Sequence, residues 1–232
     1  MNHLVFNGKD FADFSAQVLK SNFLQGGERD VTTFNVLGRS GSFILDNNRF
    51  KTVPYTVELG IIGNMQINMD AMRSFLASSK GMCRVEESQT PNIYRMAAYH
   101  KSFNPSEYDH LNGTVKLEFT AQPQRWLKSG ESKVSFTSNG SIMNPAGQTA
   151  HPLIRVYGHG SFMVGNLEVT IAEHTQAYID LDCDVMLAYC GATRMGSYVS
   201  STSHEFPELH PGTNGITLNG VTLEVTPRWF EI

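Results

Sequence analysis

Residues 216–232 read ITLNGVTLEVTPRWFEI, and this stretch indicates how the chain is built. Aliphatic and polar residues alternate through most of it, a pattern typical of short β-strands with one buried face. The end of a sequence is usually polar and poorly ordered, yet here the phrase PRWF (227–230) follows the last strand. We therefore expect Trp229 and Phe230 to cap a hydrophobic core, with Arg228 lying over an aromatic ring.

The other tryptophan of the sequence, Trp126, lies in a similar phrase. Residues 119–130 read FTAQPQRWLKSG, and again a proline, an arginine and the tryptophan close an alternating run. Two such phrases predict two structural units, which we place at residues 1–128 and 129–232. A chain of this length can bury one or two hydrophobic cores.

The first unit is expected to be an α+β domain. Asn7 and Gly8 favour a tight hairpin turn, and residues 31–59 alternate in the manner of strands. Helical spacing is convincing only at residues 67–81. The apolar face of this helix is predicted to comprise Met69, Met72, Phe75 and Leu76. Strands resume after the helix, and residues 104–113 are expected to bulge out as a loop.

The second unit is expected to be a β-sandwich, because short alternating segments follow one another between glycine, asparagine and proline. The segment GHGSFMVG (158–165) resembles a dinucleotide-binding loop, but its third glycine comes too late and no helix follows, so we expect a hairpin. Residues 194–215, rich in serine, glycine and proline, are expected to form a long surface loop. The predicted fold class is therefore mainly β, with one helix in the first unit.

Composition places the chain among ordinary folded proteins. It has 232 residues, of which 41% are hydrophobic and 17% charged. Neither a signal peptide nor a membrane-spanning run is recognisable, so we expect synthesis in a cytoplasm and no membrane insertion. Three sparse cysteines do not suggest a disulfide framework. The two predicted units carry formal charges of about +2 and −6, which disfavours a nucleic-acid-binding surface.

No catalytic or cofactor motif stands out, so we predict a protein that is not an enzyme and needs no cofactor. Cys183 and Cys190, with His174 nearby, have a spacing that fits no common zinc site. Asp180, Asp182 and Asp184 alternate along an expected strand. Their carboxylates would project together, either as a calcium site or as a solvated acidic face. The solvated face is the simpler interpretation.

Phrases along the whole sequence together resemble one protein family. They are FNGKDF (6–11), GERDVTTFNVLGRSGSFILDN (27–47), MDAMRSFLASSKG (69–81), FTAQPQRWLKSGE (119–131), FPELHPGTNGITLNG (206–220) and VTPRWFEI (225–232). In this order they resemble the distal tail protein (Dit) family of phages with long, non-contractile tails, the siphophages, mainly those of Gram-positive hosts. Each phrase alone is weakly specific, whereas their joint order is much more so.

That resemblance implies an amino-terminal ring-forming domain followed by a galectin-like β-sandwich. Copies in this family close into a hexameric ring, the hub that joins the tail tube to the tail tip or baseplate, and DNA passes through the lumen in transit. The implied partners are other copies in a homo-hexamer, the major tail tube protein, the tape-measure protein, the tail-associated tip protein and receptor-binding or baseplate proteins. The implied location is the tail tip of the virion, after assembly in the host cytoplasm.

A closed ring needs one face of a subunit to meet a different face of its neighbour, and β-strand edges suit that task. Residues 28–47 form the candidate contact hairpin. Its charges are expected either to pair across subunits or to be ordinary surface charges, while its glycines permit the turn. The candidate ring-interface residues are Arg29, Asp30, Gly38, Arg39 and Gly41.

A second group of residues is expected to shape the fold, because prolines fix φ and glycine permits unusual φ. These residues are Trp126, Pro207, Pro211, Gly212, Asn214, Pro227, Arg228 and Trp229.

A carbohydrate-binding module that recognises host cell-wall glycans is the alternative function. Sandwiches of this kind often present aromatic platforms to sugars. Because both tryptophans are expected to be buried, the candidate platforms are Tyr157, Tyr189 and Tyr198.

Overall fold

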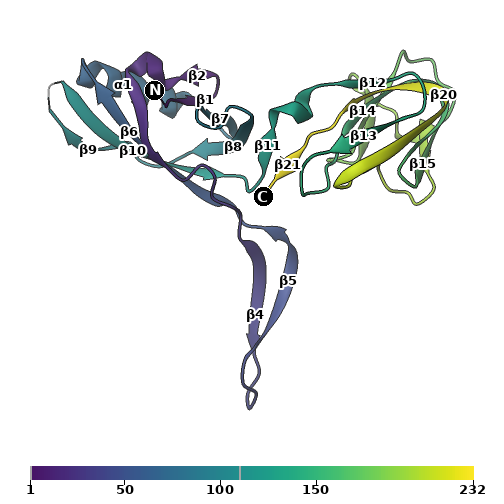
Figure 1. The fold of residues 1–232 in the computed structure, drawn as a ribbon, viewed down its shortest axis with the longest axis horizontal. Helices are drawn as coiled ribbons and strands as arrows, with labels where there is room; N and C mark the ends of the chain where they lie inside the picture. The colour runs from purple at the N-terminus through teal and green to yellow at the C-terminus, as the bar shows by residue number, and fades with distance from the viewer. Residues whose placement is uncertain (1, 110) are drawn as a thin grey trace. The chain divides into compact units, whose positions relative to one another are not determined.

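A computed structural model describes residues 2–109 and 111–232. The chain forms two compact units, of which the first ends at Arg125 and includes Ile232, and the second is Trp126–Glu231. Antiparallel strands dominate both, and the described residues contain a single α-helix, α1 (Met65–Ser78), so the mainly β fold class is confirmed (Figure 1). In the described part of the chain no helix is long and apolar enough to cross a bilayer.

The first unit is built on one antiparallel sheet, with the strand order β2-β1-β7-β8-β10-β6-β3 and with β9 paired to β10. The strands are β1 (Leu4–Phe6), β2 (Lys9–Asp10), β3 (Ala16–Ser21), β6 (Val53–Ile62), β7 (Cys83–Glu87), β8 (Ile93–Tyr99), β9 (Asn104–Tyr108) and β10 (Asn112–Ala121). The pair of ten-residue strands, β6 and β10, is in register along its whole length. Alternate residues of β10 are buried, which is the period of two that the sequence shows.

Helix α1 closes the core of this unit with its apolar face. The buried residues of the helix are Met65, Met69, Met72 and Leu76, and Phe75 packs against the same cluster. The Phe75 ring lies 6.3 Å from that of Phe6 and 6.1 Å from that of Phe11, both edge-on. The helical face predicted from the sequence is therefore confirmed.

Two turn predictions in the first unit have different outcomes. Asn7 and Gly8 have φ of 49° and 77° and join β1 to β2, so the predicted hairpin is confirmed. The loop predicted at residues 104–113 is wrong over most of its length, because β9 (Asn104–Tyr108) pairs with β10, which begins at Asn112; His110 lies outside the described residues. Pro105 lies in this segment, and proline usually indicates a loop. β9, however, pairs with β10 alone among the described strands, and a strand paired on one side can contain a proline.

The second unit is a sandwich built largely by two long strands that take part in both layers. The first half of β14 (Leu153–Val164) pairs with β16 (Ile179–Asp182), and its second half pairs with β15 (Leu167–Ile171). β14 also pairs with β20 (Gly212–Thr226), with a register shift between Gly158 and Ser161. The shift separates the two layers, since each long strand changes partners there.

The remaining strands extend the two layers. β12 (Val134–Phe136) pairs with the end of β20, and β13 (Gly140–Asn144) pairs with its start. The others are β17 (Leu187–Cys190), which pairs with β16, β18 (Thr193–Arg194), which pairs with β17, and β19 (Val199–Ser201), which pairs with β15.

Glycines make the bend in β14 and β20 possible. Gly158, Gly160 and Gly220 have φ of 87°, 139° and 80°. A Cβ on Gly160 would lie 2.2 Å from the carbonyl oxygen of Asn219. The hairpin predicted at residues 158–165 is therefore wrong, because the strand continues through a bulge. Gly220 lies inside β20 for the same reason.

The segment 194–215 is more ordered than the predicted surface loop. It contains a 3-10 turn, the strand β19 and the beginning of β20. Asn214 is buried, and its amide donates to the His210 carbonyl at 2.8 Å while its Oδ1 accepts from the His210 amide at 2.9 Å. Gly212, with φ of 87°, completes this turn. Of the two prolines, Pro207 is buried and Pro211 is exposed.

The two tryptophan phrases meet within the second unit. β11 (Arg125–Leu127) pairs with β21 (Phe230–Glu231), and the rings of Trp126 and Phe230 are 5.3 Å apart. Trp229 is buried in the core of the sandwich, as predicted. Pro227, two residues before Trp229 in the sequence, is also buried. The first phrase therefore contains the boundary between the two units, which falls between Arg125 and Trp126, and the second phrase closes the second unit at Glu231.

Arg228 does not lie over an aromatic ring as expected. Its guanidinium donates to both carboxylate oxygens of Asp182, at 2.7 and 3.1 Å. Burial by itself would raise the pKa of Asp182, but the hydrogen bonds and charge of Arg228 outweigh burial and hold that pKa below its ordinary value. The pair ties the terminal segment to β16.

This pair predicts how stability depends on pH. Because the folded-state pKa of Asp182 is depressed, the stabilisation is fully present above the ordinary value of 3.8 and is lost as the pH falls through the folded value. We expect Arg228→Gln to lower the urea midpoint of the second unit by a constant amount between about pH 7 and pH 5. The difference from the natural protein should shrink below pH 3.8. A difference that grew in acid would contradict the assignment.

Candidate assembly surface

The first unit carries a separate two-stranded ribbon, which we call the arm. It consists of β4 (Arg29–Asn35), β5 (Ser42–Phe50) and the turn between them, and its strands pair only with each other (Figure 1). None of residues 24–52 is buried. An isolated two-stranded ribbon is marginally stable in water, and it exposes unpaired backbone groups along both edges.

One face of the arm is strongly apolar. Phe34 lies directly opposite Phe43, and Leu45 follows on the same face because residues two apart share a side of a strand. Their exposed fractions are 51%, 50% and 56%, respectively. Val36 and Leu37 extend the apolar surface into the turn and are exposed as well. A contiguous apolar surface of this kind is typical of a protein–protein interface.

The opposite face is mixed. Ile44 and Val31 are exposed there, beside polar side chains. Arg29 and Asp30, predicted as ring-interface charges, both find partners within the arm. Arg29 donates to Asp46 at 2.8 Å, and Arg49 donates to Asp30 at 2.6 Å.

The hydrogen bond and charge of Arg49 lower the pKa of Asp30. Exposed pairs of this kind contribute little to stability. The two ion pairs balance the charges at the base of the arm.

The tip of the arm owes its shape to the predicted glycines. Gly38 and Gly41 have φ of 80° and 86°, values that other residues adopt only with strain. Arg39 lies between them, and its guanidinium is 4.5 Å from the centre of the Phe43 ring. The structure therefore brings Gly38, Arg39 and Gly41 together at the tip, while Arg29 and Asp30 lie at the opposite end of the ribbon.

Sequence reasoning selected the charges and glycines of the arm but missed its apolar residues. The signal was present, because residues 43–45 read FIL and follow the turn without a break. Three consecutive apolar residues in a strand place side chains on both faces. In a half-buried strand only one of those faces would be apolar.

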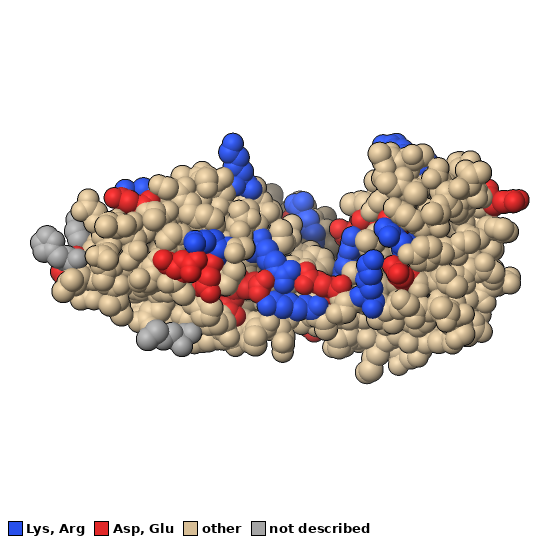
Figure 2. All heavy atoms as spheres, turned by 90° about the horizontal axis from the view of Figure 1, so that it is seen from above, with Lys and Arg blue, Asp and Glu red and all other residues tan. Residues whose placement is uncertain are grey.

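Charged side chains do not dominate the face of the protein that Figure 2 shows. Figure 2 shows Lys and Arg interspersed with Asp and Glu on the face in view, with uncharged residues covering most of it. No field of one sign covers this face, so no extended phosphate-binding surface is visible on it.

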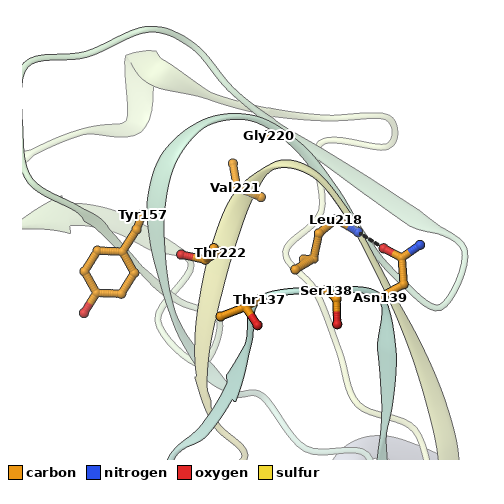
Figure 3. A pocket seen from close by; sticks show the side chains of 8 residues that line it. All are labelled: Thr137, Ser138, Asn139, Tyr157, Leu218, Gly220, Val221 and Thr222. Atoms are coloured by element: carbon orange, nitrogen blue, oxygen red, sulfur yellow. Dashed lines mark hydrogen bonds between the residues drawn. The ribbon is translucent and has the colours of Figure 1, made fainter.

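The second unit has a shallow surface hollow of about 550 Å³ beside Tyr157. Figure 3 shows the Thr222 hydroxyl pointing toward the tyrosine ring, with the hydroxyls of Thr137 and Ser138 along the same rim. Asn139 accepts a hydrogen bond from the Leu218 amide at 2.8 Å, which fixes its side-chain amide at the edge of the hollow. None of the described residues that line it is charged.

The tyrosines that we predicted as platforms differ in setting. The Tyr157 ring lies edge-on to that of Tyr178 at 6.3 Å, and the Arg155 guanidinium lies 3.9 Å from the centre of the Tyr178 ring. Tyr198 is 39% exposed and contacts His174. Tyr189 is half-buried, and burial raises its pKa. Of these tyrosines, only Tyr157 lines the hollow.

The two aspartates of β16 form ion pairs with arginines. Asp180 lies opposite Arg155 in the sheet and accepts hydrogen bonds from it at 2.7 and 2.9 Å, and Asp182 is held by Arg228. Neither the predicted solvated face nor a calcium site describes these two carboxylates. Within residues 2–109 and 111–232, no cluster of His, Cys, Asp or Glu is arranged to hold a metal ion. Burial raises the pKa of the Cys183 thiol to about 12.

Comparison with known proteins adds to this geometry. No family model and no curated protein sequence matches the chain. Among solved structures, the chain matches the crystal structure of the SPP1 Dit (gp 19.1) protein, described as a paradigm of hub adsorption apparatus in Gram-positive infecting phages. The TM-score is 0.69 at 14% identity, over 100% of this chain and 98% of that one.

A second match is weaker and does not define the fold. It is to the baseplate of phage P2 in its activated conformation with calcium, with a TM-score of 0.47 at 9% identity over 97% of each chain. The match to SPP1 Dit is the one that identifies the architecture. Together with the β-rich organisation of both units, it confirms that this chain has a Dit-like fold along its whole length.

Proposed function

We propose that the protein is a structural component of a phage virion, the distal tail hub, and that its copies close into a hexameric ring. The observation that carries this proposal is the arm, an exposed ribbon with apolar side chains, on a chain that has the fold of a hub protein. The ring joins the tail tube to the tail tip or baseplate, and DNA passes through its lumen. The role is mechanical, without catalysis or a cofactor.

The arm requires a partner for energetic reasons. Burying a side chain such as Phe34 or Phe43 stabilises a complex by about 1.5–3 kcal/mol, and neither is buried within its own chain. We infer that this partner is a second copy of the chain, because a hub ring repeats one heterologous contact around an axis.

A receiving surface is present on the first unit. A hollow of about 300 Å³ lies beside Ile62, Ala12 and Ala16, and Ile62 is 57% exposed. Leu19, also exposed, lies on the edge strand β3, whose Val18 amide donates to the Asn2 carbonyl at 2.8 Å and whose remaining edge can accept another strand. The first unit thus has both an apolar projection and an unlike apolar surface, as a head-to-tail ring requires.

The first and the second unit have different roles in this proposal. We assign ring formation to the first unit and place the galectin-like sandwich outside the ring contacts. The partners are the major tail tube protein, the tape-measure protein, the tail-associated tip protein and receptor-binding or baseplate proteins. The protein assembles in the host cytoplasm and resides at the virion tail tip.

Light scattering of the purified chain tests this function. The expected result is a discrete mass several times the 25.8 kDa of one chain, in a single closed species rather than a ladder of sizes. A mass of 25.8 kDa at every concentration, together with failure to join purified tail tubes, contradicts the proposal.

Binding of a neutral glycan is a second candidate function, and the hollow beside Tyr157 favours it. An aromatic ring can stack on a sugar, while Thr222, Thr137, Ser138 and the Asn139 amide offer hydrogen bonds, and no charge lines the site. In a hexamer, weak single sites would act together through avidity.

The glycan function is tested with purified cell-wall polysaccharide of a Gram-positive host. Retention of the protein on this polysaccharide is expected to fall at least about tenfold in Tyr157→Ala, because truncation to alanine removes the aromatic ring on which the sugar stacks. Tyr198→Ala, outside the hollow, should bind normally. Retention that is absent in the natural protein, or equal in both variants, removes this function.

A further inference from the structure

The segment that leads into the arm, residues 22–28, is held against the sheet by an arginine that is not exposed at all. We call this segment the arm root. Arg95 lies on β8, has no exposed surface, and donates a hydrogen bond from Nη2 to the Gln25 carbonyl. Its guanidinium lies 5.8 Å from the centre of the Phe23 ring. The two contacts fall on residues two positions apart in the arm root.

A buried guanidinium is an unusual choice for a β-strand in a core. Burial lowers the pKa of Arg95 to about 10, so it stays charged at neutral pH and its desolvation is a cost to folding. The buried carboxylate in this unit, Glu87, accepts instead from the hydroxyls of Tyr55 at 2.7 Å and Ser21 at 2.9 Å. The Nε and Nη1 atoms of Arg95 have no partner among the described residues. An apolar residue at this position would avoid the cost but would not bind the Gln25 carbonyl.

The two ends of the arm root are held in other ways. At the start, the Asn22 side chain accepts from the Thr56 amide at 2.7 Å and donates to the Pro54 carbonyl at 2.9 Å. At the other end, the Glu28 carbonyl accepts from the Lys51 amide at 2.8 Å. In the middle, no strand pairing is available. There Phe23 is buried with its ring 5.6 Å from that of Tyr55, and Arg95 holds the Gln25 carbonyl, beyond which the segment is no longer buried.

We propose that Arg95 is a positioning residue that fixes the arm root, and through it the direction in which the arm leaves the sheet. This inference rests on the proposed function, because the direction of the arm matters only if the arm docks on another copy. A ribbon that swings about its root offers its apolar face in many directions, and closing a ring then costs more conformational entropy. The contact of Arg95 removes that freedom before assembly.

Hydrogen exchange on the full-length chain tests the proposal without requiring a ring. In Arg95→Met, which keeps the length of the side chain but not its donors, exchange in residues 22–28 is expected to accelerate about tenfold, the effect of one charge-assisted hydrogen bond. Exchange in β10, in the centre of the sheet, should stay unchanged. Arg95→Lys, which keeps the charge and one donor direction, should give a smaller acceleration. Arg73→Met, which removes an exposed arginine of the same unit, should alter neither segment.

A second readout separates positioning from simple stabilisation. For a protein that assembles, the concentration of half-assembly should rise about tenfold in Arg95→Met, with Arg95→Lys partly restoring it. If the natural protein never assembles, the proposed function fails, while the exchange data still report on the arm root. The positioning role is overturned if exchange becomes equally faster in residues 22–28 and in β10. It is also overturned if the exchange rate of residues 22–28 is unchanged in both Arg95 variants.

Discussion

The double variant Phe34→Ser with Phe43→Ser is expected to remain folded but to lose its assembly. Both side chains lie on the apolar face of the arm, are about half exposed, and contribute nothing to the core of the first unit. Together they remove about 3–6 kcal/mol of apolar burial from each contact of a ring, which weakens each contact by about 100-fold or more. Because a ring closes only when all of its contacts form, the expected species is the 25.8 kDa monomer.

The matched control for this variant is Met143→Ser. Met143 is 69% exposed, is apolar, and lies on β13 of the second unit, far along the chain from the arm. It should leave both the mass and the unfolding midpoint unchanged. Sedimentation velocity over a wide concentration range provides the measurement. An undiminished assembly of the arm variant, or an equal loss in Met143→Ser, would show that the arm is not the contact.

Trp229→Ala is expected to cause the largest loss of stability. The side chain is 4% exposed and belongs to the sandwich core, and truncating a buried tryptophan costs about 3–5 kcal/mol. The backbone around it is closely packed as well, since the Arg228 amide donates to the Gly130 carbonyl at 2.8 Å and the Leu127 amide donates to the Trp229 carbonyl at 2.9 Å. The cavity therefore has little freedom to collapse.

Urea unfolding followed by far-UV circular dichroism measures this effect without relying on tryptophan fluorescence. The transition of the second unit should move to a lower urea concentration, while that of the first unit stays in place. Tyr198→Ala, which truncates an aromatic residue that is 39% exposed, serves as the control and should shift the midpoint little. An unchanged midpoint in Trp229→Ala would refute the packed position of the terminal segment.

Local patterns predicted those features that a short segment determines by itself. The face of α1 follows from the spacing of Met69, Met72 and Leu76, and the first hairpin follows from the positive φ that Asn7 and Gly8 tolerate. These features depend on residues a few positions apart. The sequence therefore carried enough information to place them.

Features that depend on distant partners were predicted less well. Glycine marks a turn and a bulge in the same way, so Gly158 suggested a break in a strand that in fact continues. The Asp182 partner, Arg228, is distant in sequence, and nothing local to either residue reveals the pair. The buried Arg95 is equally invisible, because its acceptor is a backbone carbonyl.

The candidate site was only half predicted for a similar reason. The glycines of the arm were recognised because turns have strict local rules, and they do form its tip. The alternation in β4 was interpreted as ordinary strand patterning, which normally means that one face is buried. Whether a strand pairs with a sheet or stands alone is a property of the tertiary structure. The exposure of Phe34 and Phe43 could therefore not be predicted from the sequence.

Negative-stain electron microscopy of the purified natural protein tests the central claim most directly, because it distinguishes rings, filaments and single particles in one image. We predict annular particles with sixfold symmetry and an open centre, which disappear in the Phe34→Ser, Phe43→Ser variant and persist in Met143→Ser. Fields of solitary particles at all concentrations, or open filaments without closed rings, would contradict the account.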